Sequence, residues 1–252
     1  MRSGTSLRNI CVLLGLAAAI ACGSGGLRLA GLSADELLAL GLERAENRKW
    51  DDAVAALEAF TFQHPTHPRY QEARYRLGDV YFEKEEYITA AAEFARLADD
   101  YPGGEWADNA RFKVCESYFE LSPRPALDQE YTLSAIEHCE SLLAYYPESE
   151  FAESARAIVG GLRDKLATKT YLVGEYYFKR RAYDSAILSF NTVLSAYPST
   201  DAAPRALLKL YETYEALGYA DEAREARERL LREYPESREA GEIREVAVTE
   251  VL

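Results

Sequence analysis

The stretch ARYRLGDVYFEKEEYITAAAEFARLADDYP, residues 73–102, decides the fold of this chain. Small and apolar residues recur in it at helical spacing in two runs, which are Ala73, Leu77, Gly78 and Tyr81, and then Ala90, Ala91, Phe94 and Leu97. The second run ends at Pro102, because proline cannot continue a helix. The stretch therefore predicts two antiparallel helices, which meet closely at the small residues Gly78 and Ala90.

The same pattern recurs along nearly the whole chain. Prolines that end a second helix stand at Pro65, Pro102, Pro147, Pro198 and Pro235. Twelve residues before each one is an alanine: Ala53, Ala90, Ala135, Ala186 and Ala223. A two-residue unit precedes these alanines in turn: Leu40-Gly41, Leu77-Gly78, Val114-Cys115, Val173-Gly174 and Leu210-Tyr211. So regular a spacing is typical of a stacked repeat protein, whose function resides in a binding surface.

The repeat resembles the tetratricopeptide family, whose Leu-Gly-x-x-Tyr, Ala, Phe and Pro positions are matched by Leu77-Gly78, Tyr81, Ala90, Phe94 and Pro102. This resemblance implies an all-α tetratricopeptide-repeat superhelix of five helix pairs. Residues 239–252 are then expected to form a C-terminal capping helix. The net charge of −13 excludes a nucleic-acid partner, since such binding needs a basic surface to displace counterions from phosphate.

The N-terminus has the pattern of a targeting segment. Arg2 and Arg8 precede an apolar run over residues 10–21, which is too short to span a bilayer but fits a signal peptide. Ala19-Ile20-Ala21-Cys22 resembles a bacterial lipobox, although the usual leucine is replaced by Ala19. We expect a signal peptide at 1–21, acylation of Cys22 by palmitate-type chains, and a flexible tether at 22–33. The alternative is an ordinary secretion signal in which Cys22 is incidental. Gly23, where an aspartate would favour the inner membrane, points to the outer membrane.

Two cysteines remain in the predicted mature body. Cys115 occupies the position that glycine holds in three other repeats, and Cys139 the position of Leu57, Phe94 and Phe190. Both positions lie where the two helices of a repeat touch, and the periplasm permits disulfides. A bridge is therefore one hypothesis; the favoured interpretation is two buried thiols that serve as small core residues.

Two repeats are longer than the others. The third has eight additional residues, Leu121 to Asp128, and the prolines Pro123 and Pro125 predict a loop between its helices. The fourth has fourteen additional residues without proline, which predicts one long helix over about 149–181, weakened in the middle by Gly160-Gly161. We expect N-terminal repeats at 34–120 and C-terminal repeats at 121–252, which include this helix.

The order of these irregularities is similar to that of the BamD family, lipoproteins of the outer-membrane β-barrel assembly machine. The matching residues are Ser122-Pro123, Asp128-Gln129, Thr132, Tyr146-Pro147, Phe151-Ala152, Leu162-Arg163, Leu166-Ala167, Glu175-Tyr176-Tyr177, Arg180-Arg181 and Ala182-Tyr183. The resemblance implies a lipid-anchored periplasmic scaffold without catalytic activity. Its partners would be the barrel-forming subunit, other lipoprotein subunits, unfolded outer-membrane proteins and, through its lipid, the membrane.

Two interaction regions are expected on this basis. The C-terminal repeats with the long helix would bind the barrel-forming subunit, through Tyr176, Arg180, Arg181, Tyr183 and Phe190. Ser189 stands where many family members carry a basic residue, so this contact would differ here. The N-terminal repeats would present a groove to extended substrate peptide, with Tyr70 and Tyr75 as candidate contacts, because aromatic grooves of solenoids bind such peptides.

No residue pattern predicts a catalytic, cofactor or metal site. His64 and His67 are three residues apart without a third ligand nearby, and His138 and Cys139 are helical neighbours whose side chains point apart. Phosphate-loop, nucleophile-elbow and zinc-protease motifs are missing from the sequence. An enzyme is thus the least favoured class. The principal alternative is a tetratricopeptide lipoprotein that serves another envelope process, such as cell-wall synthesis, secretion or motility.

Overall fold

The computed structural model describes residues 27–249, which form eleven α-helices and no strand. The predicted signal peptide, Cys22 and the start of the tether lie outside the described residues. The helices are α1 Ala34–Glu46, α2 Trp50–Gln63, α3 Tyr70–Glu83, α4 Tyr87–Asp100, α5 Ala107–Leu121, α6 Glu130–Tyr145, α7 Ala152–Lys179, α8 Tyr183–Ala196, α9 Ala202–Leu217, α10 Ala220–Glu233 and α11 Arg238–Thr249.

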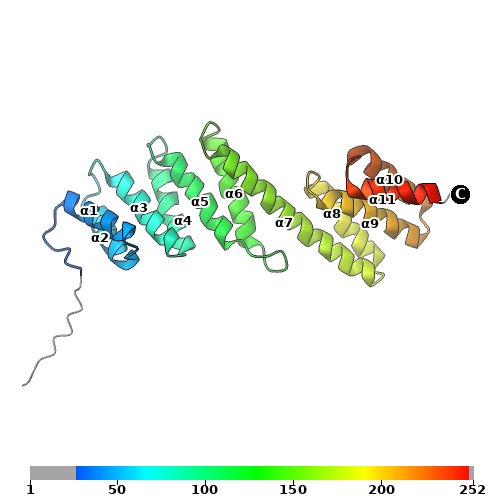
Figure 1. Ribbon diagram of the computed structural model, residues 1–252, viewed down its shortest axis with the longest axis horizontal. Helices are drawn as coiled ribbons and strands as arrows, with labels where there is room; N and C mark the ends of the chain where they lie inside the picture. The colour runs from blue at the N-terminus through cyan, green and yellow to red at the C-terminus, as the bar shows by residue number, and fades with distance from the viewer. Residues whose placement is uncertain (1–26, 250–252) are drawn as a thin grey trace, which may run out of the picture.

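Consecutive helices pair into five hairpins that stand side by side along an elongated molecule, and α11 covers the last hairpin (Figure 1). Each hairpin also packs on the next, so that apolar faces which one helix pair cannot bury alone are buried by its neighbours. The prediction of a tetratricopeptide superhelix with five pairs and a capping helix is confirmed. The capping helix begins one residue earlier than expected, at Arg238.

Close approach of the two helices within a hairpin explains the recurring glycines. A Cβ atom on Gly78 would lie 2.7 Å from the ring of Phe94, and one on Gly174 would lie 2.5 Å from Phe190. Such distances are shorter than van der Waals contact, so a larger residue would push the helices apart. The large residue opposite each glycine is completely buried, which makes this contact the centre of each hairpin.

In the third hairpin the same two positions are joined covalently. Cys115 of α5 and Cys139 of α6 form a disulfide, with Cα atoms 4.8 Å apart, and both residues are fully buried. The favoured prediction of two free thiols is therefore wrong. The physical reason is that these positions face each other in every hairpin, and two short side chains meet there without a ring to separate them.

Tyrosines before two of the repeat-ending prolines connect successive repeats. The hydroxyl of Tyr146 donates to the carbonyl oxygen of Pro102 at 2.8 Å, and that of Tyr234 donates to Pro198 at 2.7 Å. In both cases the acceptor is the proline that ends the preceding repeat. These hydrogen bonds satisfy carbonyl groups in turns that have no helical partner.

The longest helix, α7, carries two hydrophobic cores. Its first half contributes Ala155 and Val159 to a core with the third hairpin, and its second half contributes Ala167 and Tyr171 to a core with α8–α11. At 28 residues it is about 42 Å long. It begins at Ala152 and ends at Lys179, within the predicted range of about 149–181. The exposed pair at 160–161 does not interrupt it.

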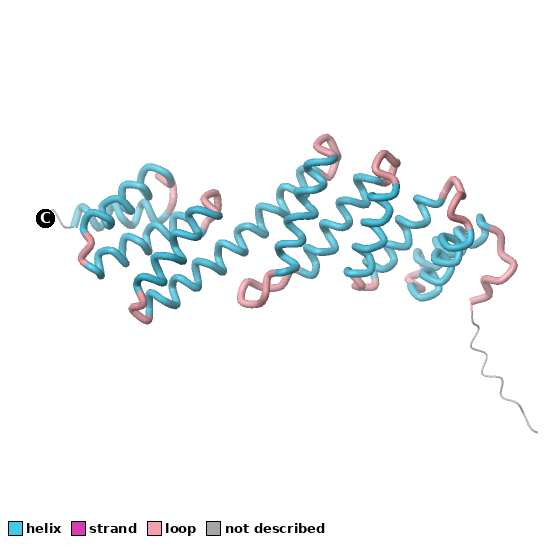
Figure 2. The backbone as a smooth tube through the Cα atoms, turned by 180° about the vertical axis from the view of Figure 1, so that it is seen from behind, coloured by secondary structure: helices cyan, strands magenta, loops and turns pink. Residues whose placement is uncertain are grey.

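The eight-residue insertion forms the predicted loop. Helix α5 ends at Leu121 and α6 begins at Glu130, and the connection projects from one long edge of the molecule (Figure 2). A core cluster that contains Phe112, Cys139 and Val159 runs across the boundary expected at position 120. The cores of neighbouring repeats are thus continuous along α5, α6 and the first half of α7.

Candidate interaction surfaces

A groove crosses the first helices of the N-terminal repeats. It has a volume of about 590 Å³ and is lined by side chains of α1, α3, α5 and the start of α2. The lining residues are Leu42, Ala45, Glu46, Trp50, Glu72, Tyr75, Arg76, Asp79, Val80, Glu83 and Lys113. Apolar, aromatic and charged groups therefore meet in one concave surface, a composition typical of ligand-binding grooves.

The floor of this groove is held by packed aromatic rings and ion pairs. Tyr75 packs against Trp106 with ring centroids 4.6 Å apart, and the guanidinium of Arg76 lies 5.5 Å from the Trp106 ring. Arg76 also pairs with Asp79 at 3.2 Å. Lys113 is paired with Glu116 at 2.8 Å. These contacts order the floor before any ligand binds, which lowers the entropic cost of binding.

Asp79 is the most perturbed carboxyl group in the groove. Burial raises the pKa of Asp79 to about 6, and the nearby charge of Glu83 acts in the same direction. The positive charges of Lys113 and Arg76 oppose this shift without cancelling it. The fold therefore compensates only part of the free-energy cost of burying the ionised carboxylate of Asp79.

The two tyrosines predicted to line a peptide groove lie on different faces of α3. Tyr75 lines the groove but is only 7% exposed, because most of its ring belongs to the core with Phe94. Tyr70 instead accepts a hydrogen bond from Arg74 Nε at 3.0 Å and packs near Tyr101. Tyr70 therefore does not line this groove, since five helical residues turn a side chain to another face, and its contact with a substrate peptide stays a prediction.

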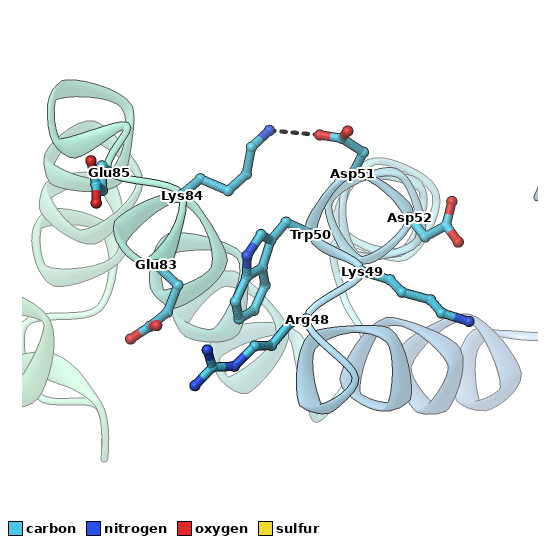
Figure 3. A pocket seen from close by; sticks show the side chains of 8 residues that line it. All are labelled: Arg48, Lys49, Trp50, Asp51, Asp52, Glu83, Lys84 and Glu85. Carbon is cyan, nitrogen blue, oxygen red and sulfur yellow. Dashed lines mark hydrogen bonds and ion pairs between the residues drawn. The ribbon is translucent and has the colours of Figure 1, made fainter.

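A second cavity, also about 590 Å³, lies beside the first at the turns within repeats one and two. Figure 3 shows Trp50 at its centre, and the hydrogen bond of 2.8 Å from Lys84 to Asp51 at its rim. Trp50 and Glu83 line both cavities. Sequence reasoning did not single out Trp50, although its place at the first turn of a helix, after a charged loop, was visible.

The C-terminal surface predicted to bind a partner is formed by the end of α7 and the turn that follows. Tyr176 is 52% exposed, and the guanidinium of Arg180 lies 4.4 Å from the centre of its ring. Arg181 is exposed, with a positive φ of 59°, and Tyr183 packs on Phe178 with ring centroids 5.9 Å apart. The turn therefore presents two cationic side chains and an aromatic ring at one end of the long helix.

Phe190 does not belong to this surface. It is completely buried against Gly174 and Tyr171, so the prediction that it touches a partner is wrong. Its ring fills the contact between α7 and α8, as Phe94 does between α3 and α4. The adjacent Ser189 donates its hydroxyl to the carbonyl of Ser185 within its own helix at 2.9 Å.

The inserted loop is braced against α7, which sequence reasoning missed. Lys165 Nζ donates to Ser122 Oγ at 2.8 Å, and Lys169 Nζ donates to the carbonyl of Leu127 at 2.7 Å. Burial lowers the pKa of Lys165, whose partners in the described chain are neutral oxygens. The spacing of the two lysines on one helix face was the available signal. The braced loop presents Leu127, half exposed, to solvent.

The three histidine side chains pack against aromatic rings. His64 and His67 flank the ring of Phe60 in the turn after α2, and His138 stacks on Tyr118 with centroids 4.7 Å apart. Burial lowers the pKa of His138. Across residues 27–249 there is no group of three or more histidine, cysteine or acidic side chains placed to hold a metal ion. In the same range no helix has the length and apolarity to cross a bilayer.

Curated relatives of this chain carry the name outer membrane protein assembly factor BamD. The relative from Caulobacter vibrioides is 28% identical over 188 residues, which cover 75% of this chain and 62% of the relative. That from Rickettsia prowazekii is 24% identical and covers 79% of each chain. That from Vibrio cholerae is 25% identical and covers 68% of this chain and 76% of its own length.

A family model for outer membrane lipoproteins, YfiO, matches residues 32–230 of this chain. The matched range begins just before α1 and ends within α10, so it includes four hairpins, most of the fifth, the inserted loop and the long helix. The resemblance drawn from the two lengthened repeats is thereby confirmed. The chain belongs to the YfiO family of outer membrane lipoproteins.

Proposed function

We propose that this chain is a lipid-anchored scaffold for the assembly of β-barrel proteins at the periplasmic face of the outer membrane. The observation that carries this proposal is the placement of two different surfaces on one continuous stack of helices, within a family of outer membrane lipoproteins. Helix α7 contributes to the core of the third hairpin and to the core of α8–α11, so it connects the N-terminal repeats to the C-terminal ones. Such an arrangement suits a protein that brings two partners together.

The C-terminal surface would bind the barrel-forming subunit. Tyrosine and arginine are the residue types that contribute most to protein interfaces, because they combine apolar area with hydrogen-bonding groups. Tyr176 is half exposed, and Arg180 is already placed over its ring. The pair would thus be ordered before the partner arrives, which reduces the entropy lost on binding.

The N-terminal groove would receive extended segments of unfolded outer-membrane proteins. Successive side chains of an extended peptide point to opposite sides, so every second side chain can enter a groove. The groove of α1, α3 and α5 offers apolar contacts at the partly exposed Leu42 and Trp50 and polar contacts at Glu46 and Glu83. It therefore suits segments in which apolar and polar side chains alternate, as in the strands of a barrel.

Affinity purification from membranes tests the C-terminal interface. We expect the double variant Tyr176→Ala with Arg180→Ala to lose the co-purifying barrel-forming subunit. The matched control is Tyr219→Ala with Arg224→Ala, since Tyr219 is equally exposed at 51% and lies in the next intra-repeat turn. Equal recovery of the subunit with both double variants would contradict the assigned interface.

Depletion of the chain tests the process. A decline of many outer-membrane barrel proteins together is expected, whereas a defect confined to cell-wall synthesis, secretion or motility would favour the alternative scaffold.

Membrane fractionation of the Cys22→Ala variant tests the anchor: loss of acylation would release the chain from membranes, because the lipid supplies the apolar area that holds it there. Retention of this variant at the membrane would contradict the lipid anchor.

A further inference from the structure

The groove of α1, α3 and α5 has an apolar part that a ligand can reach at Leu42, Ala45 and Trp50, which are partly exposed, whereas Val80 is only 2% exposed. Leu42, Ala45 and Val80 lie in the lining with Trp50, and none of these side chains is charged. At about 590 Å³ the groove lies within the range of cavities that bind ligands larger than a single side chain. An indole face in such a position contacts flat or extended apolar groups, and attracts cations through its ring quadrupole.

The charged side chains that line the groove are more often negative than positive. Its two cations are already neutralised, Arg76 by Asp79 and Lys113 by Glu116. Glu72 is likewise paired, with Arg69. Two further lining carboxylates, Glu46 and Glu83, are exposed and form no ion pair within the described chain.

A ligand side chain that is to match both the apolar and the acidic lining residues must combine an apolar stem with a positive charge. Lysine and arginine have this structure, because three or four methylene groups separate the charge from the backbone. A carboxylate in the ligand would be repelled by Glu46 and Glu83, and a purely apolar side chain would leave these two charges without a partner. The net charge of −13 also favours the approach of cationic segments.

We propose that this groove selects extended peptide segments that carry a lysine or arginine, with the stem of that side chain against Trp50 and its charge beside Glu46 and Glu83. The inference names the class of segment that the groove receives, and in that respect it rests on the proposed function. With this preference, the N-terminal repeats select segments in which a cationic side chain stands among alternating polar and apolar residues.

Peptide titrations with the purified full chain test this selectivity. The probes are three capped peptides of alternating valine and threonine whose central residue is lysine, norleucine or glutamate. Calorimetry reports binding, together with the fluorescence of the two tryptophans, Trp50 and Trp106. We expect the lysine peptide to bind about tenfold more tightly than the norleucine peptide, and the glutamate peptide to bind more weakly still. Equal affinities for the lysine and norleucine peptides, or no binding of the lysine peptide at millimolar concentration, would overturn the proposal.

Variants locate the effect in the groove. Glu46→Gln with Glu83→Gln should weaken the lysine peptide about tenfold and leave the norleucine peptide unchanged. The control, Glu222→Gln with Glu225→Gln, removes the same charge from exposed positions on α10 and should alter either affinity by less than about twofold. An equal loss in both variants would show that net charge alone attracts the peptide, which would overturn the site.

The outcome is separable from that of the proposed scaffold role. The glutamine variant of the groove leaves the surface of Tyr176 and Arg180 intact, so it should still retain the barrel-forming subunit on purification from membranes. Circular dichroism and the urea unfolding midpoint establish that both variants are folded. Lysine selectivity in a chain that does not retain the subunit would contradict the scaffold assignment alone, and retention without lysine selectivity would contradict the groove alone.

Discussion

Reduction of the Cys115–Cys139 disulfide is expected to lower the free energy of unfolding substantially. The two cysteines are 24 residues apart in sequence, and the intervening chain contains the inserted loop. In the chain-entropy description, release of a loop of this length stabilises the unfolded state by about 3.4 kcal/mol. For a protein of ordinary stability this is a large share of the total.

Urea unfolding followed by circular dichroism measures this difference. Because the disulfide is buried, the chain is first reduced in urea and then refolded with reductant present. The variant Cys115→Gly with Cys139→Phe provides the informative comparison, since it rebuilds the pair formed by Gly78 and Phe94 in the second hairpin. We expect this variant to recover part of the lost stability and to be insensitive to reductant.

Substitution of both cysteines by serine serves as the second comparison, because it removes the bond and leaves two hydroxyl groups in a buried position. Hydrogen exchange should show the loss of protection first in α5 and α6. An unchanged unfolding midpoint in a chain whose two thiols are shown to be free would refute the reasoning. It would mean that side-chain packing, and not the covalent link, holds the third hairpin together.

Three further outcomes follow from the helical geometry and the buried charge. Gly174→Ala should destabilise the chain by about 1–3 kcal/mol, because its Cβ would overlap Phe190. Gly161→Ala in the same helix has open space around the added Cβ and should stabilise the chain by up to about 1 kcal/mol. Urea unfolding measures both changes. For Asp79 the folded-state pKa of about 6 lies above the ordinary value of 3.8, so ionisation opposes folding. The free energy of unfolding of the natural chain, relative to that of Asp79→Asn, should therefore fall by up to about 3 kcal/mol as pH rises from about 4 through 6. A difference in unfolding free energy that is constant with pH would contradict this. Arg181, which has a φ of 59°, should accept glycine with little change in thermal midpoint and lose about 1–2 kcal/mol on substitution by valine.

The sequence predicted the fold with few errors because helical repeats are built from local patterns. Gly78, Phe94 and Pro102 each act within one hairpin, and their spacing can be read directly from the chain. The inserted loop was predicted for the same reason, since Pro123 and Pro125 exclude a helix whatever surrounds them. The positions of the long helix and the capping helix were likewise predicted to within three residues.

The errors concern side chains whose surroundings come from more than one element. Phe190 was expected on a surface and is buried, because the helix pairing places it opposite Gly174. Tyr70 and Tyr75 are close in sequence, but the turn of α3 sends them to different faces. The bracing of the loop by Lys165 depends on contact between segments 43 residues apart. The spacing of Lys165 and Lys169 indicates that they share a helix face, but not what that face contacts.

By itself, the sequence determined the helices, their pairing and the two places where the repeat lengthens, because each depends on residues within about forty positions of one another. Tertiary structure decided which residues of these helices remain accessible. It joined Cys115 to Cys139, and it brought Trp50 beside Glu46 and Glu83 in a groove shared by three repeats. The reason is that a stacked solenoid builds its surfaces from neighbouring repeats, so the chemistry of a groove is set by the packing between them.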